Sequence, residues 1–217
     1  MKIELLNPYV IKILISLRKE DSISSVSKRI HLSYGWTHKW VSELIKEGIL
    51  KEKWRGFVLN ERSKSYRGII GFLKENLNDI NFYYYSLKLF GISYSFTKTD
   101  AVYIWTEGGY NIARYKEYYP VFIKIKKEDY HLFLDYCKRL GLKINSNKGV
   151  FYVTEILEDF KIVKKNGFNV ESLKETIDFM QANIYNFEPA LEMIKEMYNK
   201  KLNVRYKEIN YQDERAY

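Results

Sequence analysis

Apolar side chains recur at helical spacing in the first third of the chain. From Pro8 to Leu17 they cover most of a helix circumference, which predicts a buried first helix with Asn7 as its cap and Pro8 in its first turn. A second helix is predicted from Asp21 or Ser22, because the next apolar residues are three and four positions apart: Ile23, Val26 and Ile30. The pattern therefore begins with two helices joined by a short connection.

The segment "HLSYG" interrupts this pattern, and Ser33 is well placed to cap a third helix from Tyr34 to Lys46. One side of the third helix is predicted to be buried and consists of Thr37, Trp40, Val41, Leu44 and Ile45. The opposite side consists of Gly35, Lys39, Ser42, Glu43 and Lys46. Gly48 is expected to end the helix as a left-handed cap.

The stretch "ILKEKWRGFVLN" has alternating side chains on either side of a glycine. It predicts a strand, an Arg55–Gly56 turn and a second strand. A fourth helix is expected from Ser63 to Leu77.

Aromatic residues become frequent near residue 80, where we place the start of a second domain. The predicted domains are therefore residues 1–79 and 80–217. A helix that ends at Gly91 should begin the second domain, with Tyr83, Leu87 and Phe90 on one face. After it we expect strands at 101–106, 121–126, 142–146, 149–156 and 160–165, and helices at 127–140, 169–183 and 187–201. The predicted fold class is α+β, with a mostly antiparallel sheet in the second domain.

The positive charge of the chain is concentrated near its N-terminus. The net charge is +9, and residues 1–80 contain 15 Lys and Arg against 9 Asp and Glu, a net of +6. This asymmetry favours an anionic partner for the N-terminal part, and nucleic acid is the leading candidate.

The order helix, helix, turn, helix and two-stranded hairpin resembles the winged helix-turn-helix DNA-binding domain. The resemblance covers roughly residues 8–77 and rests on "ISSVSKRIHLSYGWTHKWVSELIKEGILKEKW". It implies double-stranded DNA as the partner, with the third helix in the major groove and the hairpin, or wing, on a phosphate backbone or in the minor groove. The chain departs from the usual pattern at Gly35, Trp36 and Trp40, where smaller or more helix-favouring residues are commoner.

The resemblance also assigns candidate DNA-binding residues. Those expected to face bases are Tyr34, Gly35, Trp36, His38 and Lys39. Those expected near phosphates are Ser33, Ser42 and Lys46, and those at the wing tip are Lys53, Trp54 and Arg55. Lys51 and Lys53 also fit a solvated hairpin face.

The two tryptophans of the third helix differ in their expected roles. Trp40 lies beside Val41 and Leu44, so we expect it in the core. Trp36 lies further round the helix, where it either packs against the first helix or touches DNA.

Little in the remaining sequence indicates catalysis. Cys137 is the only cysteine, which excludes a disulfide, and its apolar neighbours place it in a core. His131 has no Cys or His at ligand spacing, and Asp100 lacks a second carboxylate of a magnesium pair. We therefore predict that the chain is not an enzyme and has no cofactor and no metal. The alternative is a nucleic-acid-processing enzyme that depends on Asp100 or Glu107.

The chain has no signal peptide and no run of 18 apolar residues, so we expect a cytoplasmic protein with no membrane partner. Its many Lys, Ile, Glu and Tyr residues are typical of an archaeal or thermophilic source.

The overall layout also resembles AbiEi-type antitoxin and regulator proteins. The segments concerned are "YYSLKLFG", "DAVYIW" and "GFNVESLKETIDFM", with Gly91 and the pair Ile177–Asp178 at the matching positions; the His that often precedes the glycine is absent. This resemblance implies an antitoxin that represses its own operon and opposes a nucleotidyltransferase toxin as its protein partner. The first hypothesis remains a sequence-specific transcriptional regulator. A palindromic site would require a homodimer, whereas two-domain regulators of this size also bind as monomers.

Overall fold

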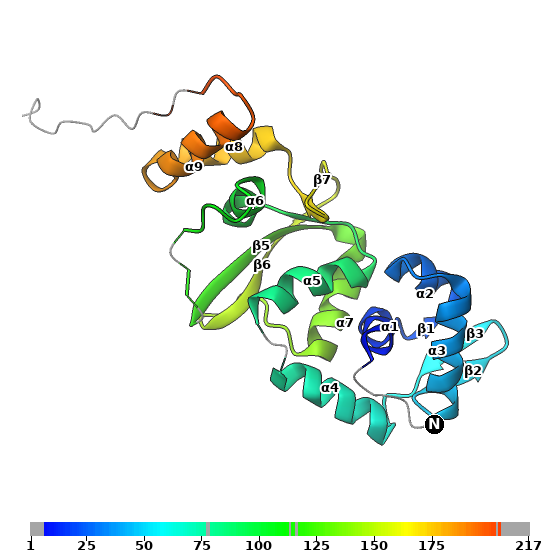
Figure 1. The fold of residues 1–217 in the computed structure, drawn as a ribbon. Helices are drawn as coiled ribbons and strands as arrows, with labels where there is room; N and C mark the ends of the chain where they lie inside the picture. The colour runs from blue at the N-terminus through cyan, green and yellow to red at the C-terminus, as the bar shows by residue number, and fades with distance from the viewer. Residues whose placement is uncertain (1–6, 77–78, 113, 116, 203, 205–217) are drawn as a thin grey trace, which may run out of the picture. The chain divides into compact units, whose positions relative to one another are not determined.

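The structure is a computed structural model that describes residues 7–76, 79–112, 114–115, 117–202 and 204 (Figure 1). The fold is mixed α+β, as predicted. The chain forms two compact units: unit 1 comprises residues 1–94 and 115–160, and unit 2 comprises residues 95–114 and 161–217. The expected boundary after residue 79 stays a prediction about separately folding domains, because in this structure residues 80–94 group with the N-terminal segment.

Unit 1 begins with a helix–strand–helix–helix–strand–strand order. The elements are α1 (Pro8–Ser16), β1 (Glu20–Asp21), α2 (Ile23–Ile30), α3 (Tyr34–Lys46), β2 (Leu50–Lys53) and β3 (Gly56–Leu59). The three strands form an antiparallel sheet in the order β1-β3-β2. The sequence predicted these three helices and both hairpin strands, but not β1, which has only two residues.

The caps expected at Asn7 and Ser33 are present, and Ser22, one of the two expected starts of the second helix, is the cap of α2. The side chain of Asn7 accepts a hydrogen bond from Tyr9 N at 3.0 Å, and that of Ser22 accepts one from Ser25 N at 3.1 Å. Ser33 caps α3 by accepting a hydrogen bond from Trp36 N at 3.4 Å. After α3, Gly48 has a φ of +67°, the left-handed conformation that glycine adopts without strain.

The turn between β2 and β3 differs by one residue from the prediction. Gly56 pairs with Lys53 as the first residue of β3, so Trp54 and Arg55 form the turn. The glycine is needed for a close approach: a Cβ atom on Gly56 would lie 2.1 Å from the backbone oxygen of Asp21 in β1.

The rest of unit 1 consists of three α-helices, a 3-10 turn and a pair of long strands. Its elements are α4 (Lys64–Asn76), α5 (Ile80–Phe90), β5 (Tyr118–Lys126), the 3-10 turn η1 (Lys127–Asp129), α7 (Tyr130–Leu140) and β6 (Gly149–Leu157). The expected Leu77 end of the fourth helix lies outside the described residues. Gly91 ends α5 in the left-handed conformation, as predicted.

The longest strand pair is parallel, so the prediction of a mostly antiparallel sheet is wrong here. β5 and β6 pair in parallel from Tyr118 opposite Gly149 to Lys126 opposite Leu157. The reason is the connection: α7 carries the chain back to the end at which β5 began, as in a strand–helix–strand crossover. The core against this pair includes Tyr152 of β6, whose ring centroid lies 4.8 Å from that of Tyr83 in α5 and 5.3 Å from that of Phe133 in α7.

Unit 2 combines helices with short strands. Its elements are the last part of β4 (Tyr94–Phe96), α6 (Lys98–Trp105), β7 (Val163–Lys165), β8 (Phe168–Val170), α8 (Leu173–Ala182) and α9 (Ile184–Met197). β8 pairs in parallel with β4 and antiparallel with β7. The two final helices agree with the prediction apart from their bounds.

The strand expected at 101–106 is wrong, because this segment belongs to α6. Ala101, Val102, Ile104 and Trp105 are all buried, and a helix buried on several sides has the same continuous apolar run as a buried strand. Of the other expected strands, 142–146 contributes only an isolated bridge at Ile144 and 160–165 is reduced to β7. Among the described residues, no helix has the length and apolar character needed to cross a membrane.

Candidate nucleic-acid interface

The helix α3 is anchored by one face and presents the other outward. Thr37, Trp40, Val41 and Leu44 are buried. Trp40 is 9% exposed, which confirms its expected place in the core. Because a helix has 3.6 residues per turn, burial of this stripe leaves the candidate base-facing residues Tyr34, Gly35, His38 and Lys39 exposed on the remaining surface.

A groove separates α3 from the β2–β3 turn. It has a volume of about 340 Å³. Six of the candidate residues line it: Tyr34, His38 and Ser42 of α3, and Lys53, Trp54 and Arg55 of the hairpin. The structure therefore brings three of the predicted helix residues together with the three predicted wing residues on one face of unit 1.

The hairpin tip is the most exposed part of this face. Trp54 is 95% exposed, a large apolar surface for a residue with no role in the core. Arg55 beside it is also exposed. Lys53 forms an ion pair with Glu20 of β1, and its hydrogen bond lowers the pKa of the Glu20 carboxyl. Both partners are largely exposed, so water and salt screen the pair and Lys53 remains accessible to another anion.

An aromatic cluster lies on the opposite flank of α3. The ring of Tyr9 in α1 stacks on Trp36, with centroids 5.6 Å apart, and lies 6.4 Å from Trp40. Lys39 Nζ lies 4.8 Å from the centroid of the Trp36 ring and 5.2 Å from that of Trp40. Trp36 thus packs against the first helix yet remains 47% exposed, so the two expected roles coexist. Sequence reasoning missed Tyr9; its place beside Pro8 at the start of a helix was the available signal.

The remaining candidates are arranged less distinctively. Ser33 is engaged as the cap of α3, and Lys46 pairs with Glu43 at 2.8 Å. Gly35 has open space around it, because a Cβ atom added there would meet nothing within 4 Å. Close packing is therefore not the reason for this glycine.

Three cations of α3 and the hairpin form no ion pair with any described residue. Among residues 33–56, all of which the structure describes, the cations that form no ion pair are Lys39, Lys51 and Arg55. Lys39 belongs to α3, and the other two belong to the hairpin. Both elements therefore carry positive charge available to a phosphate backbone.

A buried ion pair holds the base of this face. Arg29 of α2 donates to both carboxylate oxygens of Asp21 in β1, at 2.7 and 3.0 Å. Burial works against the charged form of Arg29, but the hydrogen bonds and negative charge of Asp21 outweigh it and raise the pKa of the guanidinium. The pair ties β1 to α2, and β1 in turn pairs with β3 of the hairpin.

The last carbonyl groups of α1 accept hydrogen bonds from side chains of α2 and of α7. Ser16 O accepts from Arg29 at 2.7 Å and from the hydroxyl of Tyr136 at 2.7 Å. Ile15 O accepts from Arg139 at 3.0 Å. Two cations thus lie at the negative end of this helix, where its dipole favours them.

The side chains named for an enzyme are occupied in ion pairs. Asp100 is fully buried, and Arg114 donates to it at 2.8 Å. Glu107 pairs with Lys165 at 2.7 Å, which lowers the pKa of the carboxyl. His131 is exposed on α7. No group of three potential metal ligands occurs among the described residues.

Two other residues named in the sequence analysis are Cys137 and Asp178. Cys137 is buried in unit 1, as expected, and burial raises the pKa of its thiol. Asp178 is exposed on α8, next to the buried Ile177.

Comparison of the chain with protein-family models, with curated proteins and with solved structures found no match.

Proposed function

We propose that residues 8–59 form a winged helix-turn-helix that binds double-stranded DNA, and that the protein is a sequence-specific transcriptional regulator. In this proposal α3 enters the major groove, and the β2–β3 hairpin lies on the backbone or in the minor groove. The observation that carries it is the groove between α3 and the hairpin, which gathers six of the candidate DNA-binding residues on one face.

Three further features support the proposal. The order helix, strand, two helices and two-stranded hairpin agrees with a winged helix-turn-helix. The pairing of β1 with β3 joins the hairpin to the strand that precedes α2. Lys39 and Arg55 lie on the two elements that would contact DNA, and neither is paired with a carboxylate of the described residues. The exposed indole of Trp54 at the tip provides an apolar surface of the kind that proteins place against sugars or bases in a minor groove.

Fluorescence anisotropy of the full-length protein tests the proposal. One labelled duplex should carry the sequence upstream of the protein's own gene, and a second should carry the same bases in scrambled order. We expect a preference for the upstream duplex that persists when the salt concentration is raised. Equal binding of both duplexes that disappears with salt would contradict sequence-specific recognition, since it would mean that only phosphates are contacted.

Two substitutions locate the contact surface. Lys39→Ala and Arg55→Ala should each weaken binding, and loss of a base contact costs about 1–3 kcal/mol, roughly a 5- to 150-fold loss of affinity. Lys148→Ala is the matched control, because Lys148 is exposed in the loop between α7 and β6. Unchanged affinity in both test variants, or an equal loss in the control, would remove this placement of α3 and the hairpin.

A further inference from the structure

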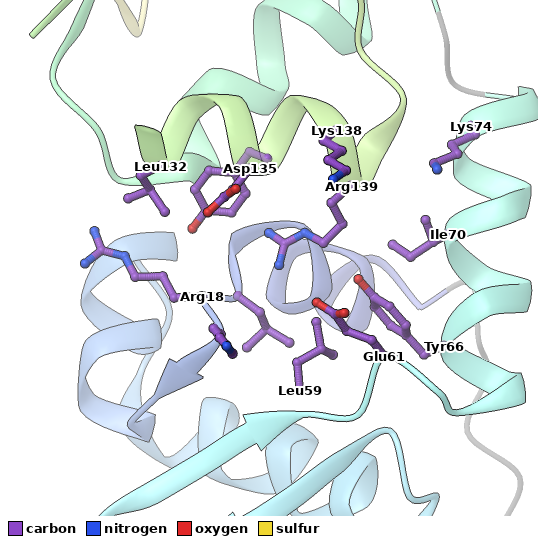
Figure 2. Close-up of a pocket in the computed structure, with 13 residues that line it drawn as sticks. Arg18, Leu59, Glu61, Tyr66, Ile70, Lys74, Leu132, Asp135, Lys138 and Arg139 are labelled. Carbon is purple, nitrogen blue, oxygen red and sulfur yellow. The ribbon is translucent and has the colours of Figure 1, made fainter. Parts of the chain in front are cut away.

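A cavity of about 560 Å³ lies between α1, the end of β3, α4 and α7, all within unit 1 (Figure 2). Cavities of roughly 300–1,000 Å³ are typical of small-molecule sites. Its apolar wall includes Leu59 of β3, Ile70 of α4 and Leu132 of α7. The cavity therefore has the size and part of the surface that an organic ligand requires.

The polar part of the cavity has an excess of positive charge. Five cations line it: Arg18, Lys19, Lys74, Lys138 and Arg139. They face two carboxylates, Glu61 and Asp135. In the described part of the chain none of these seven side chains forms an ion pair. A cavity with three more positive than negative charges attracts an anion.

Two buried donors in the cavity wall lack an acceptor. The hydroxyl of Tyr66, a residue only 5% exposed, and Nε of Arg139 are both shielded from water, and neither the O–H nor the Nε–H has an acceptor among the described residues. Figure 2 shows the hydroxyl of Tyr66 and the guanidinium of Arg139 directed toward the same part of the cavity. Burial raises the pKa of Tyr66, while the positive charge of Arg139 and a hydrogen bond from its side chain act in the opposite direction. A guanidinium only donates, so that bond ends on the oxygen of Tyr66, and the O–H still lacks an acceptor in the described part of the chain.

Buried polar groups in proteins are almost always hydrogen-bonded, and an unpaired one costs stability. Two such donors in one wall, next to a positively charged cavity, indicate that the acceptor is supplied from outside the chain. A planar carboxylate offers two oxygens that accept from an arginine and a second donor together. The apolar wall favours an organic body over a small inorganic anion.

We propose that this cavity is a binding site for a small organic carboxylate. The carboxylate accepts hydrogen bonds from Arg139 and Tyr66, and the body of the ligand lies against Leu59, Ile70 and Leu132. Because the two donor atoms are covered in the empty cavity, the Arg139 side chain has to turn slightly on binding. A hydrogen bond to Ile15 O at 3.0 Å, contact with the Tyr136 ring and the interaction with the Tyr66 oxygen hold it in its present position. The proposal does not depend on DNA binding.

Isothermal titration calorimetry of the full-length protein with benzoate tests the proposal. Benzamide, which has the same shape and no charge, is the matched control ligand, and inorganic phosphate is the control anion. We expect saturable binding of benzoate, with benzamide weaker by at least about tenfold, the loss expected for one charge-assisted hydrogen bond. Absence of benzoate binding, equal affinity for benzamide, or tighter binding of phosphate would each overturn the carboxylate site.

Two variants connect the binding to the cavity. Arg139→Gln should reduce benzoate affinity by at least about tenfold. Since Arg139 also supports α1, Tyr66→Phe provides a second variant that removes only the unpaired hydroxyl. Tyr66→Phe should change the stability of the empty protein little, because among the described residues the hydroxyl oxygen meets only Arg139 and the O–H has no acceptor, and should weaken benzoate binding severalfold. Tyr118→Phe, at an exposed tyrosine outside the cavity, should change neither property. Benzoate affinity unchanged in both cavity variants would overturn the proposal.

Discussion

Replacement of Trp40 by alanine tests whether the two tryptophans of α3 contribute differently to stability. The Trp40 side chain is 9% exposed, and a buried tryptophan removes roughly 150–250 Å² from water, which at about 25 cal/mol per Å² corresponds to roughly 4–6 kcal/mol. The unfolded chain already covers part of that area, so the upper value is too large. The indole nitrogen has no partner among the described residues, so no hydrogen bond is lost. We expect Trp40→Ala to lower the free energy of unfolding by about 3–5 kcal/mol.

Trp36→Ala is the internal comparison, because Trp36 belongs to the same helix but is 47% exposed. It loses its stacking on Tyr9, a contact of about 0.5–1.5 kcal/mol, and only part of its buried area. Urea denaturation followed by far-ultraviolet circular dichroism measures both variants without relying on tryptophan fluorescence. A Trp40→Ala protein within about 1 kcal/mol of the wild type, or a larger loss for Trp36→Ala, would refute the assignment of Trp40 as the anchor of α3.

Three further predictions concern the supports of the interface and the core. Gly56→Ala should weaken DNA binding and destabilise unit 1, because its Cβ would lie 2.1 Å from Asp21 O. Urea denaturation measures the stability and anisotropy measures the DNA affinity. Wild-type values of both would contradict this prediction. Asp21→Asn leaves Arg29 charged and buried, and should cost about 3–5 kcal/mol of unfolding free energy. Glu43→Gln, which breaks an exposed pair, is its control and should leave that energy nearly unchanged. Burial raises the pKa of Tyr83 to about 12, above its value of about 10 in an unfolded chain. Its contribution to stability is therefore complete below about pH 10 and is lost as the pH rises through about 12; denaturation curves at increasing pH should show this fall, and Tyr83→Phe should reduce it.

The sequence predicted the N-terminal part of unit 1 well because the determinants there are local. Asn7, Ser22 and Ser33 each bond to a backbone N–H two or three residues away, so the cap and the helix start are visible in the same short stretch. Most of the candidate interface follows for the same reason: α3 and the hairpin are adjacent in the chain and joined by a short turn after Gly48. The turn itself was misplaced by one residue, because its register depends on how closely β1 approaches Gly56.

Features that depend on distant partners were not predictable. The parallel pairing of β5 with β6 depends on the path of the chain through α7, and hydrophobic periodicity does not reveal it. The apolar run at 101–106 fits a buried strand and a buried helix equally well, so periodicity did not reveal that the segment is helical. The donors of the cavity wall, Tyr66 and Arg139, are 73 positions apart, and no motif links them. Tyr9 was missed because its partner Trp36 belongs to another helix.

The hydrogen bonds at the end of α1 bear on whether the N-terminal segment is modular. A fragment ending at residue 79 would retain Arg29 but lose Tyr136 and Arg139, and with them one of the two donors to Ser16 O and the Arg139 donor to Ile15 O. Its first helix would also lose α7, which shares the wall around Leu17. We therefore expect the segment that carries the candidate interface to need α7 for full stability, and a transplant onto another protein to need a substitute for that helix.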